Sequence, residues 1–197
     1  MPDVAVDACC LINLLAGGRI LCPGSEPSEA AAARNLAMGL TLHVPTQVIE
    51  ESLYLLEPDD EDPGKLVKAP VDLAPYVRAG LLDPCHVETR EEIDLFVQLA
   101  TTLDDGEAAC LAIAKIRGWM LATDDRPAGK LANRLGVEVI TTPGLLRLWA
   151  ERTEASRHEV ATVLRSIQTF ARFIPRHDSP DYAWWIDQLA QAEGGGE

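Results

Sequence analysis

The sequence predicts an α/β fold in which a parallel sheet of about five strands carries helices on both faces, with further C-terminal helices. Short apolar segments typical of buried strands alternate with segments of helical periodicity up to about residue 142. Beyond that point the strand signals end, while helical periodicity continues. The length of 197 residues is enough to bury the core of one such domain and to leave an appendage.

The first half of the chain begins with a strand followed by a helix. The apolar residues 4–6 end at Asp7, and the helix over residues 8–16 stops at Gly17. The further elements expected here are a helix over residues 28–38, a strand over residues 42–44, a helix capped by Thr46 that carries Val48, Ile49, Leu53 and Leu56, an acidic surface loop over residues 57–64, a helix over residues 71–82 and a strand over residues 85–87.

Capping signals organise the second half. Thr89 with Glu92, and Ser156 with Glu159, have the spacing of capping boxes. The expected elements are helices over residues 90–102, 104–117, 128–135, 143–152, 156–173 and 182–192, and strands over residues 119–123 and 137–141. We divide the chain into a domain over residues 1–148 and a C-terminal helical extension over residues 149–197, which we expect to pack on the domain or on a partner.

The charge balance limits the classes of partner. Lys and Arg number 17 against 31 Asp and Glu, which gives a formal net charge of −14 and argues against broad, salt-driven binding to a phosphate backbone. Binding to nucleic acid then needs a local basic patch or a metal ion at an acidic site. The five cysteines form no C-x-x-C pair, and neither a signal peptide nor a membrane span is recognisable. We therefore expect a cytoplasmic protein that does not associate with membranes.

Acidic residues follow strands or begin helices at several separate places. Asp7 follows the first strand, and Asp124 and Asp125 follow the strand over residues 119–123. Because parallel strands share one direction, both strands end at the same edge of the sheet, where ligands of such folds bind. Further acids begin a later helix or lie about one turn after the second strand: Asp104, Asp105, Glu107, Glu50 and Glu51.

A single acid at a helix start is readily explained as a cap. A cluster of carboxylates is different, because it repels itself and at least one pKa rises unless a cation neutralises it. Mg²⁺ and Mn²⁺ prefer carboxylate oxygen and bridge to phosphate, and two such ions can activate water against a phosphodiester. No Ser/His/Asp or Cys/His arrangement, glycine-rich phosphate loop or zinc-site spacing competes with this interpretation.

Four segments, in this order, resemble parts of one known family. V-A-V-D-A-C-C-L-I-N-L-L resembles its first strand, first aspartate and Leu-rich helix, and V-P-T-Q-V-I-E-E-S-L-Y-L its second strand and glutamate-bearing helix. L-D-D-G-E-A-A-C-L-A-I-A resembles the L-D-x-G-E-A segment of one bacterial and archaeal branch, and L-A-T-D-D-R-P-A-G-K-L the T-x-D or D-D turn with its helix. The family is that of the PIN domains, and the resemblance covers about residues 3–148.

This resemblance implies a three-layer α/β/α fold, Mg²⁺ or Mn²⁺ at the acids and, in most members, ribonuclease activity selective for single strands. The implied metal-binding and catalytic positions are Asp7, Glu51 with Glu50 as the alternative, Glu107, and Asp124 or Asp125. Asp104 would lie close by, Thr123 would supply a hydroxyl contact, and Asp104 or Asp105 could orient the attacking water. The candidate contacts to RNA are Arg126 and Lys130, together with Arg19 and Arg134.

The resulting hypothesis is a Mg²⁺- or Mn²⁺-dependent endoribonuclease that hydrolyses phosphodiester bonds of single-stranded RNA, with residues 1–148 as its nuclease domain. Because many small PIN proteins are toxins of toxin–antitoxin pairs, the resemblance also implies a toxin role, an antitoxin partner and a homodimer. The alternative is a non-catalytic PIN-like binding or assembly module, which the acidic charge and C-terminal helices favour. A phosphatase is disfavoured, because Asp7 begins no D-x-D motif. The D-R-P turn departs from the D-x-D-F of many toxins, so Asp124 and Asp125 both remain open.

Overall fold

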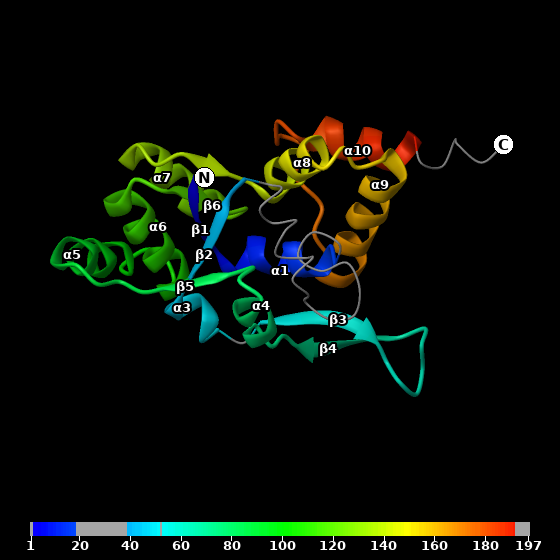
Figure 1. Ribbon diagram of the computed structural model, residues 1–197, viewed down its shortest axis with the longest axis horizontal. Coiled ribbons are helices and arrows are strands. Elements are labelled where there is room, and N and C mark those ends of the chain that lie inside the picture. Colours follow the sequence, from blue (N-terminus) through cyan, green and yellow to red (C-terminus); the bar gives the residue numbers. More distant parts are fainter. Residues whose placement is uncertain (1, 19–38, 52, 192–197) are drawn as a thin grey trace.

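The computed structural model describes residues 2–18, 39–51 and 53–191, and a parallel sheet forms its centre (Figure 1). The strands lie in the order β5 (Asp83–Cys85), β2 (Thr41–Pro45), β1 (Asp3–Val6), β6 (Met120–Ala122) and β7 (Val139–Ile140). Each neighbouring pair in this sheet is parallel. The predicted parallel sheet of five strands is therefore confirmed.

Helices cover both faces of the sheet (Figure 1). On one face, α6 (Asp105–Arg117) contacts β1, β2 and β6, and α5 (Arg90–Leu99) and α7 (Arg126–Leu135) pack beside it. On the other face, α1 (Ala8–Ala16) packs against α8 (Thr142–Arg152). Much of α6 consists of buried alanines, whose small side chains let this helix lie close to the strands. The predicted three-layer α/β/α sandwich is confirmed.

The strand order creates a place where loops from distant parts of the chain meet. From β1 the chain continues to β2 on one side, whereas β6 pairs with the opposite side of β1. The carboxyl ends of β1 and β6 thus lie next to each other where the strand order reverses, the position at which open α/β sheets bind ligands. The backbone N–H of Asp7 donates to the carbonyl of Ala122 at 3.0 Å and joins these two ends.

The helices expected between residues 46 and 82 are largely wrong. α3 covers only Thr46–Ile49 and α4 only Ala74–Arg78. Between them, β3 (Tyr54–Pro58) and β4 (Leu66–Pro70) form an antiparallel hairpin, whose turn contains most of the acidic stretch and which extends away from the sheet (Figure 1). Leu53 and Leu56 have helical spacing, but their burial comes from this hairpin, and its pairing is not visible in a local pattern.

Three further differences are local. Thr46 does not cap α3, because Pro45 holds the capping position and the Thr46 hydroxyl donates to the carbonyl of Cys85 at 3.2 Å. β5 begins two residues before the strand predicted over residues 85–87, because it is Asp83–Cys85 that pairs with β2 at the edge of the sheet. The helix predicted over residues 28–38 lies outside the described residues. The remaining predicted elements occur close to their expected positions.

The C-terminal helices share the core of the sheet domain. α9 (Arg157–Ser166) continues into a π-helical turn over Ile167–Ala171, and α10 (Tyr182–Gln191) follows after a connection. Ile167 and Trp185 are fully buried in the same apolar cluster as the strands. The connection returns towards the sheet, and Arg147 on α8 donates to Asp181 at 2.8 Å. A domain division at residue 148 stays a prediction.

A buried ion pair joins α5 to α6. Glu92 is 0% exposed and accepts a hydrogen bond from Nε of Arg117 at 2.6 Å. Its carboxylate also closes the capping box of α5, because the backbone N–H groups of Glu88 and Thr89 donate to it. The Arg117 hydrogen bond is the main reason why the pKa of Glu92 falls to about 2. The pair lies away from the acidic edge and holds two helices of one layer in register.

Candidate functional site

Three aspartates cap three helices at the carboxyl edge of the sheet. Asp7 caps α1, Asp104 caps α6 and Asp125 caps α7. Capping satisfies free backbone N–H groups of the first turn and fixes where each carboxylate points. The donors are the backbone N–H groups of Ala8 (2.7 Å), Glu107 (2.8 Å) and Ala128 (2.7 Å), respectively.

Thr123 connects two of these aspartates. Its hydroxyl donates to Oδ2 of Asp7 at 2.9 Å and accepts from the backbone N–H of Asp125 at 3.1 Å. The thiol of Cys9 donates to the same Asp7 oxygen at 3.0 Å. Thr123 is only 2% exposed, so this geometry suits a residue that positions carboxylates better than one that contacts substrate.

Gly106 gives Glu51 access to the first turn of α6. A Cβ built on Gly106 would lie 2.0 Å from Oε1 of Glu51, so only a glycine leaves room for this carboxylate. Glu51 follows α3 at a bend in the chain, and the neighbouring Glu50 caps the C-terminus of α3 and is exposed. The glycine in the D-D-G-E segment therefore brings an acid from one loop against the acids of another.

Burial and neighbouring carboxylates raise the pKa of several acids at this edge. Partial burial, then the charge of Asp104 and then that of Asp7 raise the pKa of Glu51 to about 7. Burial, followed by the charges of Asp104, Asp125 and Asp7, raises the pKa of Glu107 to about 7. Burial also raises the pKa of Asp7, against hydrogen bonds that lower it. The structure thus brings together Asp7, Glu51, Asp104, Glu107 and Asp125.

Asp124 faces a different set of partners. Its carboxylate accepts hydrogen bonds from Nδ2 of Asn13 at 3.0 Å and from the backbone N–H and hydroxyl of Thr142. The thiol of Cys10 adds a weaker bond at 3.4 Å. Burial raises the pKa of Asp124, and the hydrogen bonds from Thr142 oppose this rise. The charge of Asp124 is not among those that raise the pKa of Glu51 or Glu107.

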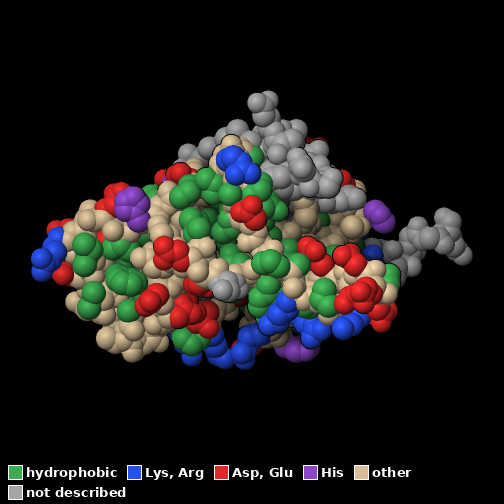
Figure 2. Space-filling model, turned by 90° about the horizontal axis from the view of Figure 1, so that it is seen from below, with side chains coloured by type: hydrophobic (Ala, Val, Ile, Leu, Met, Phe, Trp, Pro, Cys, Tyr) green, Lys and Arg blue, Asp and Glu red, His purple; other side chains and the backbone are tan. Residues whose placement is uncertain are grey.

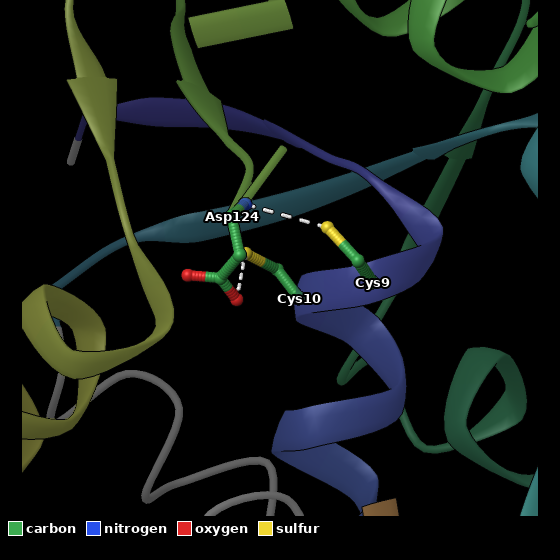
Figure 3. A group of neighbouring side chains, drawn as sticks. All are labelled: Cys9, Cys10 and Asp124. Atoms are coloured by element: carbon green, nitrogen blue, oxygen red, sulfur yellow. Dashed lines mark hydrogen bonds between the residues drawn. The ribbon is translucent and has the colours of Figure 1, made fainter. Parts of the chain in front are cut away.

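Within the described residues, Cys9, Cys10 and Asp124 form a group whose potential ligand atoms lie within 4.8 Å of one another (Figure 3). The bonds drawn there link the backbone N–H of Asp124 to Cys9 and the thiol of Cys10 to the Asp124 carboxylate. Both cysteines hydrogen-bond to Asp124, whose carboxylate is also occupied by Asn13 and Thr142. We therefore interpret this group as hydrogen-bonded support between α1 and the turn after β6.

In donor type the five carboxylates suit a hard divalent cation better, although within the described residues it is the cysteine group whose potential ligand atoms lie within 4.8 Å of one another. All five acids offer carboxylate oxygen, the ligand that Mg²⁺ and Mn²⁺ prefer. The raised pKa values of Glu51 and Glu107 reflect burial first and neighbouring negative charge second, and a cation would neutralise that charge. The access of Glu51 over Gly106 adds a ligand position that any larger side chain would close.

Two of the open cavities that adjoin these acids also contain Asp104 or Asp125. One has a volume of about 520 Å³ and is lined by Gln47, Glu50, Glu51, Asp104, Asp105 and Gly106. The other has a volume of about 390 Å³ and extends from Asp125 along α7 to the connection before α10. In Figure 2, acidic side chains gather in separate patches and Lys and Arg side chains form a row along the lower edge of the molecule. This face is therefore mixed in charge, despite the acidic total of the chain.

The predicted RNA contacts are distributed unevenly. Arg126 is exposed beside the second cavity, and its Nη1 lies 3.7 Å from Oδ2 of Asp178. Lys130 and Arg134 are exposed on α7, and neither lines that cavity. Arg19 lies outside the described residues.

Sequence reasoning missed Asn13, Thr142 and Gly106. A signal for Asn13 was present, because a polar residue in the apolar segment L-I-N-L-L needs a buried partner. Gly106 stands inside a helix, where glycine is unfavourable unless space requires it. Thr142 gave no comparable signal, since its role depends on a strand order that a local pattern does not reveal.

Comparison with protein families identifies the fold. A family model described as "DUF3368: PIN domain" matches residues 41–177, more than half of the chain. The protein belongs to the PIN-domain family. The matched region contains Glu51, Asp104, Glu107 and Asp125, while Asp7 precedes it, directly after the central strand. No curated protein and no solved structure matches the chain.

The predicted family is thus confirmed, and with it a nuclease-type fold. PIN domains are generally nucleases, bind nucleic acid and hold divalent metals. The family match runs through residue 177, so it includes part of the region that we assigned to the C-terminal extension. Within the described residues, every helix is too short or too polar to cross a membrane.

Proposed function

We propose that this PIN-domain protein is a metal-dependent endoribonuclease that hydrolyses phosphodiester bonds of single-stranded RNA. One observation carries the proposal: five carboxylates from four separate segments lie near the edge where the strand order reverses, and burial followed by neighbouring carboxylate charge raises the pKa of Glu51 and Glu107 to about 7. Such a group is unfavourable without a cation, so its assembly at this edge needs a functional reason.

Four side chains would hold the metal in this proposal: Asp7, Glu51, Glu107 and Asp125. Asp125 is preferred to Asp124, because the charge of Asp125 acts on Glu107 whereas the Asp124 carboxylate is occupied by Asn13 and Thr142. Mg²⁺ or Mn²⁺ bound there would lower the pKa of a coordinated water and stabilise charge on the leaving oxygen.

The remaining residues position groups or protons. Thr123 keeps Asp7 and the Asp125 turn in a fixed relation through its two hydrogen bonds. Asp104 is exposed, uses Oδ1 to cap α6 and lies near both glutamates, so its carboxylate can orient an attacking water. Asp105 lines the cavity of about 520 Å³ together with Asp104 and is the weaker candidate for orienting the water.

The test is cleavage of a labelled single-stranded RNA with Mn²⁺. We expect cleavage by the wild type, its loss in EDTA and a loss of at least about 100-fold in Asp7→Asn. Asp60→Asn, at the hairpin turn, makes the same charge change in an exposed position and should leave the rate unchanged. Cleavage that persists in Asp7→Asn and in EDTA would overturn the proposal, because it would not come from this site.

The toxin role, an antitoxin partner, a homodimer and a cytoplasmic location extend this proposal through the family resemblance. Expression of the protein in a bacterial host tests the toxin role directly. Growth arrest by the wild type, absent with Asp7→Asn, supports a toxin, whereas normal growth with active enzyme argues against one.

A non-catalytic binding module is the second candidate. The net charge of −14 and the acidic turn of the projecting hairpin favour it, since both suit a protein partner better than RNA. In that case the wild type should bind no Mn²⁺, and a partner should bind regardless of Asp7→Asn.

A further inference from the structure

The second cavity beside the acids combines features that suit a nucleotide. It has a volume of about 390 Å³ and begins at Asp125, the cap of α7. Phe173, Pro143 and Val139 supply apolar and aromatic surface, and Asn133 supplies an amide. An aromatic surface beside hydrogen-bonding groups is how proteins hold unstacked bases of single strands.

Two arginines from distant parts of the chain line the same cavity. Arg126 is the first residue of α7 and directly follows Asp125, while Arg176 belongs to the connection before α10. Their side chains are 54% and 67% exposed, so both guanidinium groups are open to solvent. Paired arginines are suited to phosphate, because each offers several N–H donors in a planar array.

Asp178 currently occupies the space between these arginines. Its Oδ2 lies 3.7 Å from Nη1 of Arg126, and its Oδ1 accepts a hydrogen bond from Nε of Arg176 at 3.2 Å. Arg176, and then Arg126, keep the pKa of Asp178 below its usual value. Asp178 is itself 60% exposed, and exposed ion pairs of this kind contribute little to stability. A phosphodiester of bound RNA carries one negative charge like Asp178, so it can compete with this exposed carboxylate for the two arginines.

We propose that this cavity is the subsite for a nucleotide next to the cleaved bond, with Arg126 and Arg176 binding its phosphate and Asp178 acting as an internal competitor. The inference rests on the proposed RNA-cleaving function and adds a specificity-determining surface to it. It also explains how a chain of charge −14 can bind RNA, since the positive charge is local and is released only when a phosphate displaces Asp178.

The test is binding of a fluorescent single-stranded RNA in EDTA, measured by anisotropy so that no cleavage occurs. Asp178→Asn should bind RNA about 3- to 10-fold more tightly than the wild type. Its affinity should fall more steeply with salt, by about 0.7 in log–log slope for one additional phosphate contact. Arg176→Ala should bind more weakly, and Asp178→Asn should have a smaller effect in the Arg176→Ala background, where only Arg126 is left to be released.

A matched control is available on α5. Asp94 pairs with Arg90 at 3.0 Å and is 56% exposed, so Asp94→Asn removes one negative charge from a similar exposed pair remote from the cavity. Equal gains for Asp178→Asn and Asp94→Asn would overturn the subsite, because only the total charge would then matter. An unchanged affinity of Arg176→Ala would also overturn it.

The two proposals fail in distinguishable ways. If wild-type protein cleaves RNA with Mn²⁺ but these variants bind like the control, the subsite is wrong and the nuclease remains. If wild-type protein neither binds nor cleaves RNA, the nuclease proposal fails and the subsite fails with it. Circular dichroism of Arg176→Ala shows whether that variant is folded. Asp178→Asn is an independent test, because it should raise the affinity for RNA whereas Arg176→Ala should lower it.

Discussion

Substitution of Gly106 by alanine tests the site without removing any carboxylate. The added Cβ would lie 2.0 Å from Oε1 of Glu51, and this oxygen must move by about 1.4 Å to reach the 3.4 Å of an ordinary contact. Glu51 is exposed, so its side chain can turn outward at small cost. A displacement of about 1 Å in a catalytic group can reduce a rate by about 100-fold. We expect Gly106→Ala to lower Mn²⁺-dependent cleavage by about 10- to 100-fold.

The same substitution should hardly change stability. Alanine is favoured over glycine within a helix by about 1 kcal/mol, and the contact to Cγ2 of Val48 at 3.3 Å offsets part of this gain. Gly129→Ala on α7 is the control for metal binding and stability, because its Cβ would meet nothing within 4 Å; since Gly129 lines the second cavity, this variant is not a control for RNA cleavage. Calorimetric titration with Mn²⁺ and thermal unfolding should show weaker metal binding for Gly106→Ala alone, with Tm within a few degrees of the wild type.

A double-mutant cycle makes the reasoning refutable. In a Glu51→Ala background, Gly106→Ala has no carboxylate to displace and should cause no further loss of activity. If the two losses add, Gly106→Ala acts through something other than Glu51. If Gly106→Ala keeps wild-type metal affinity and activity, the close approach of the Glu51 carboxylate to Gly106 has no functional role.

Three other predictions concern stability and the assignment of ligands. Glu92→Gln should destabilise the protein at pH 7 by on the order of 3 kcal/mol, because the folded-state pKa of about 2 lies below the ordinary 4.5. This contribution is present above pH 4.5 and is lost as the pH falls towards 2. If urea unfolding shows a difference in stability between the variant and the wild type that stays constant over this pH range, the role of Arg117 is contradicted. Asp124→Ala should lower the free energy of unfolding by about 3 kcal/mol or more, since it leaves several buried donors without an acceptor. Asp125→Asn should keep the free energy of unfolding within about 1 kcal/mol of the wild type and lose Mn²⁺ binding. The reverse result would make Asp124 the metal ligand and Asp125 the structural residue. Trp185→Ala should cost about 3–5 kcal/mol in the same unfolding assay, because this side chain is 0% exposed, and a smaller effect would mean that α10 is not part of the core.

Local signals predicted most of the fold. Buried apolar runs such as Val4–Val6 and N-terminal caps such as Asp7 and Thr89 depend on neighbours within one turn or strand, so their pattern is sufficient. The hairpin of Tyr54–Pro58 with Leu66–Pro70 could not be predicted in this way. Its stability comes from pairing across the intervening turn, and its leucine spacing is equally compatible with a helix.

The site was predictable as a set of acids but not in its details. Asp124 and Asp125 are adjacent in sequence, yet one carboxylate is buried among Asn13 and Thr142 and the other caps α7 beside Glu107. Their directions are decided by the turn after β6 and by the packing of α1 against α8, neither of which is written in a short motif. The ion pair of Glu92 with Arg117 was hidden for the same reason, because it joins two helices.

Calorimetric titration of the wild type, Glu107→Gln and Cys10→Ser with Mn²⁺ tests the central claim most directly. Glu107→Gln removes one charge from the carboxylate group, whereas Cys10→Ser replaces a thiol of the neighbouring cysteine group with a hydroxyl of similar shape. If the carboxylates hold the cation, the wild type and Cys10→Ser bind Mn²⁺ alike and Glu107→Gln binds at least about tenfold more weakly. Equal binding by the wild type and Glu107→Gln, or loss of binding in Cys10→Ser alone, would contradict the account.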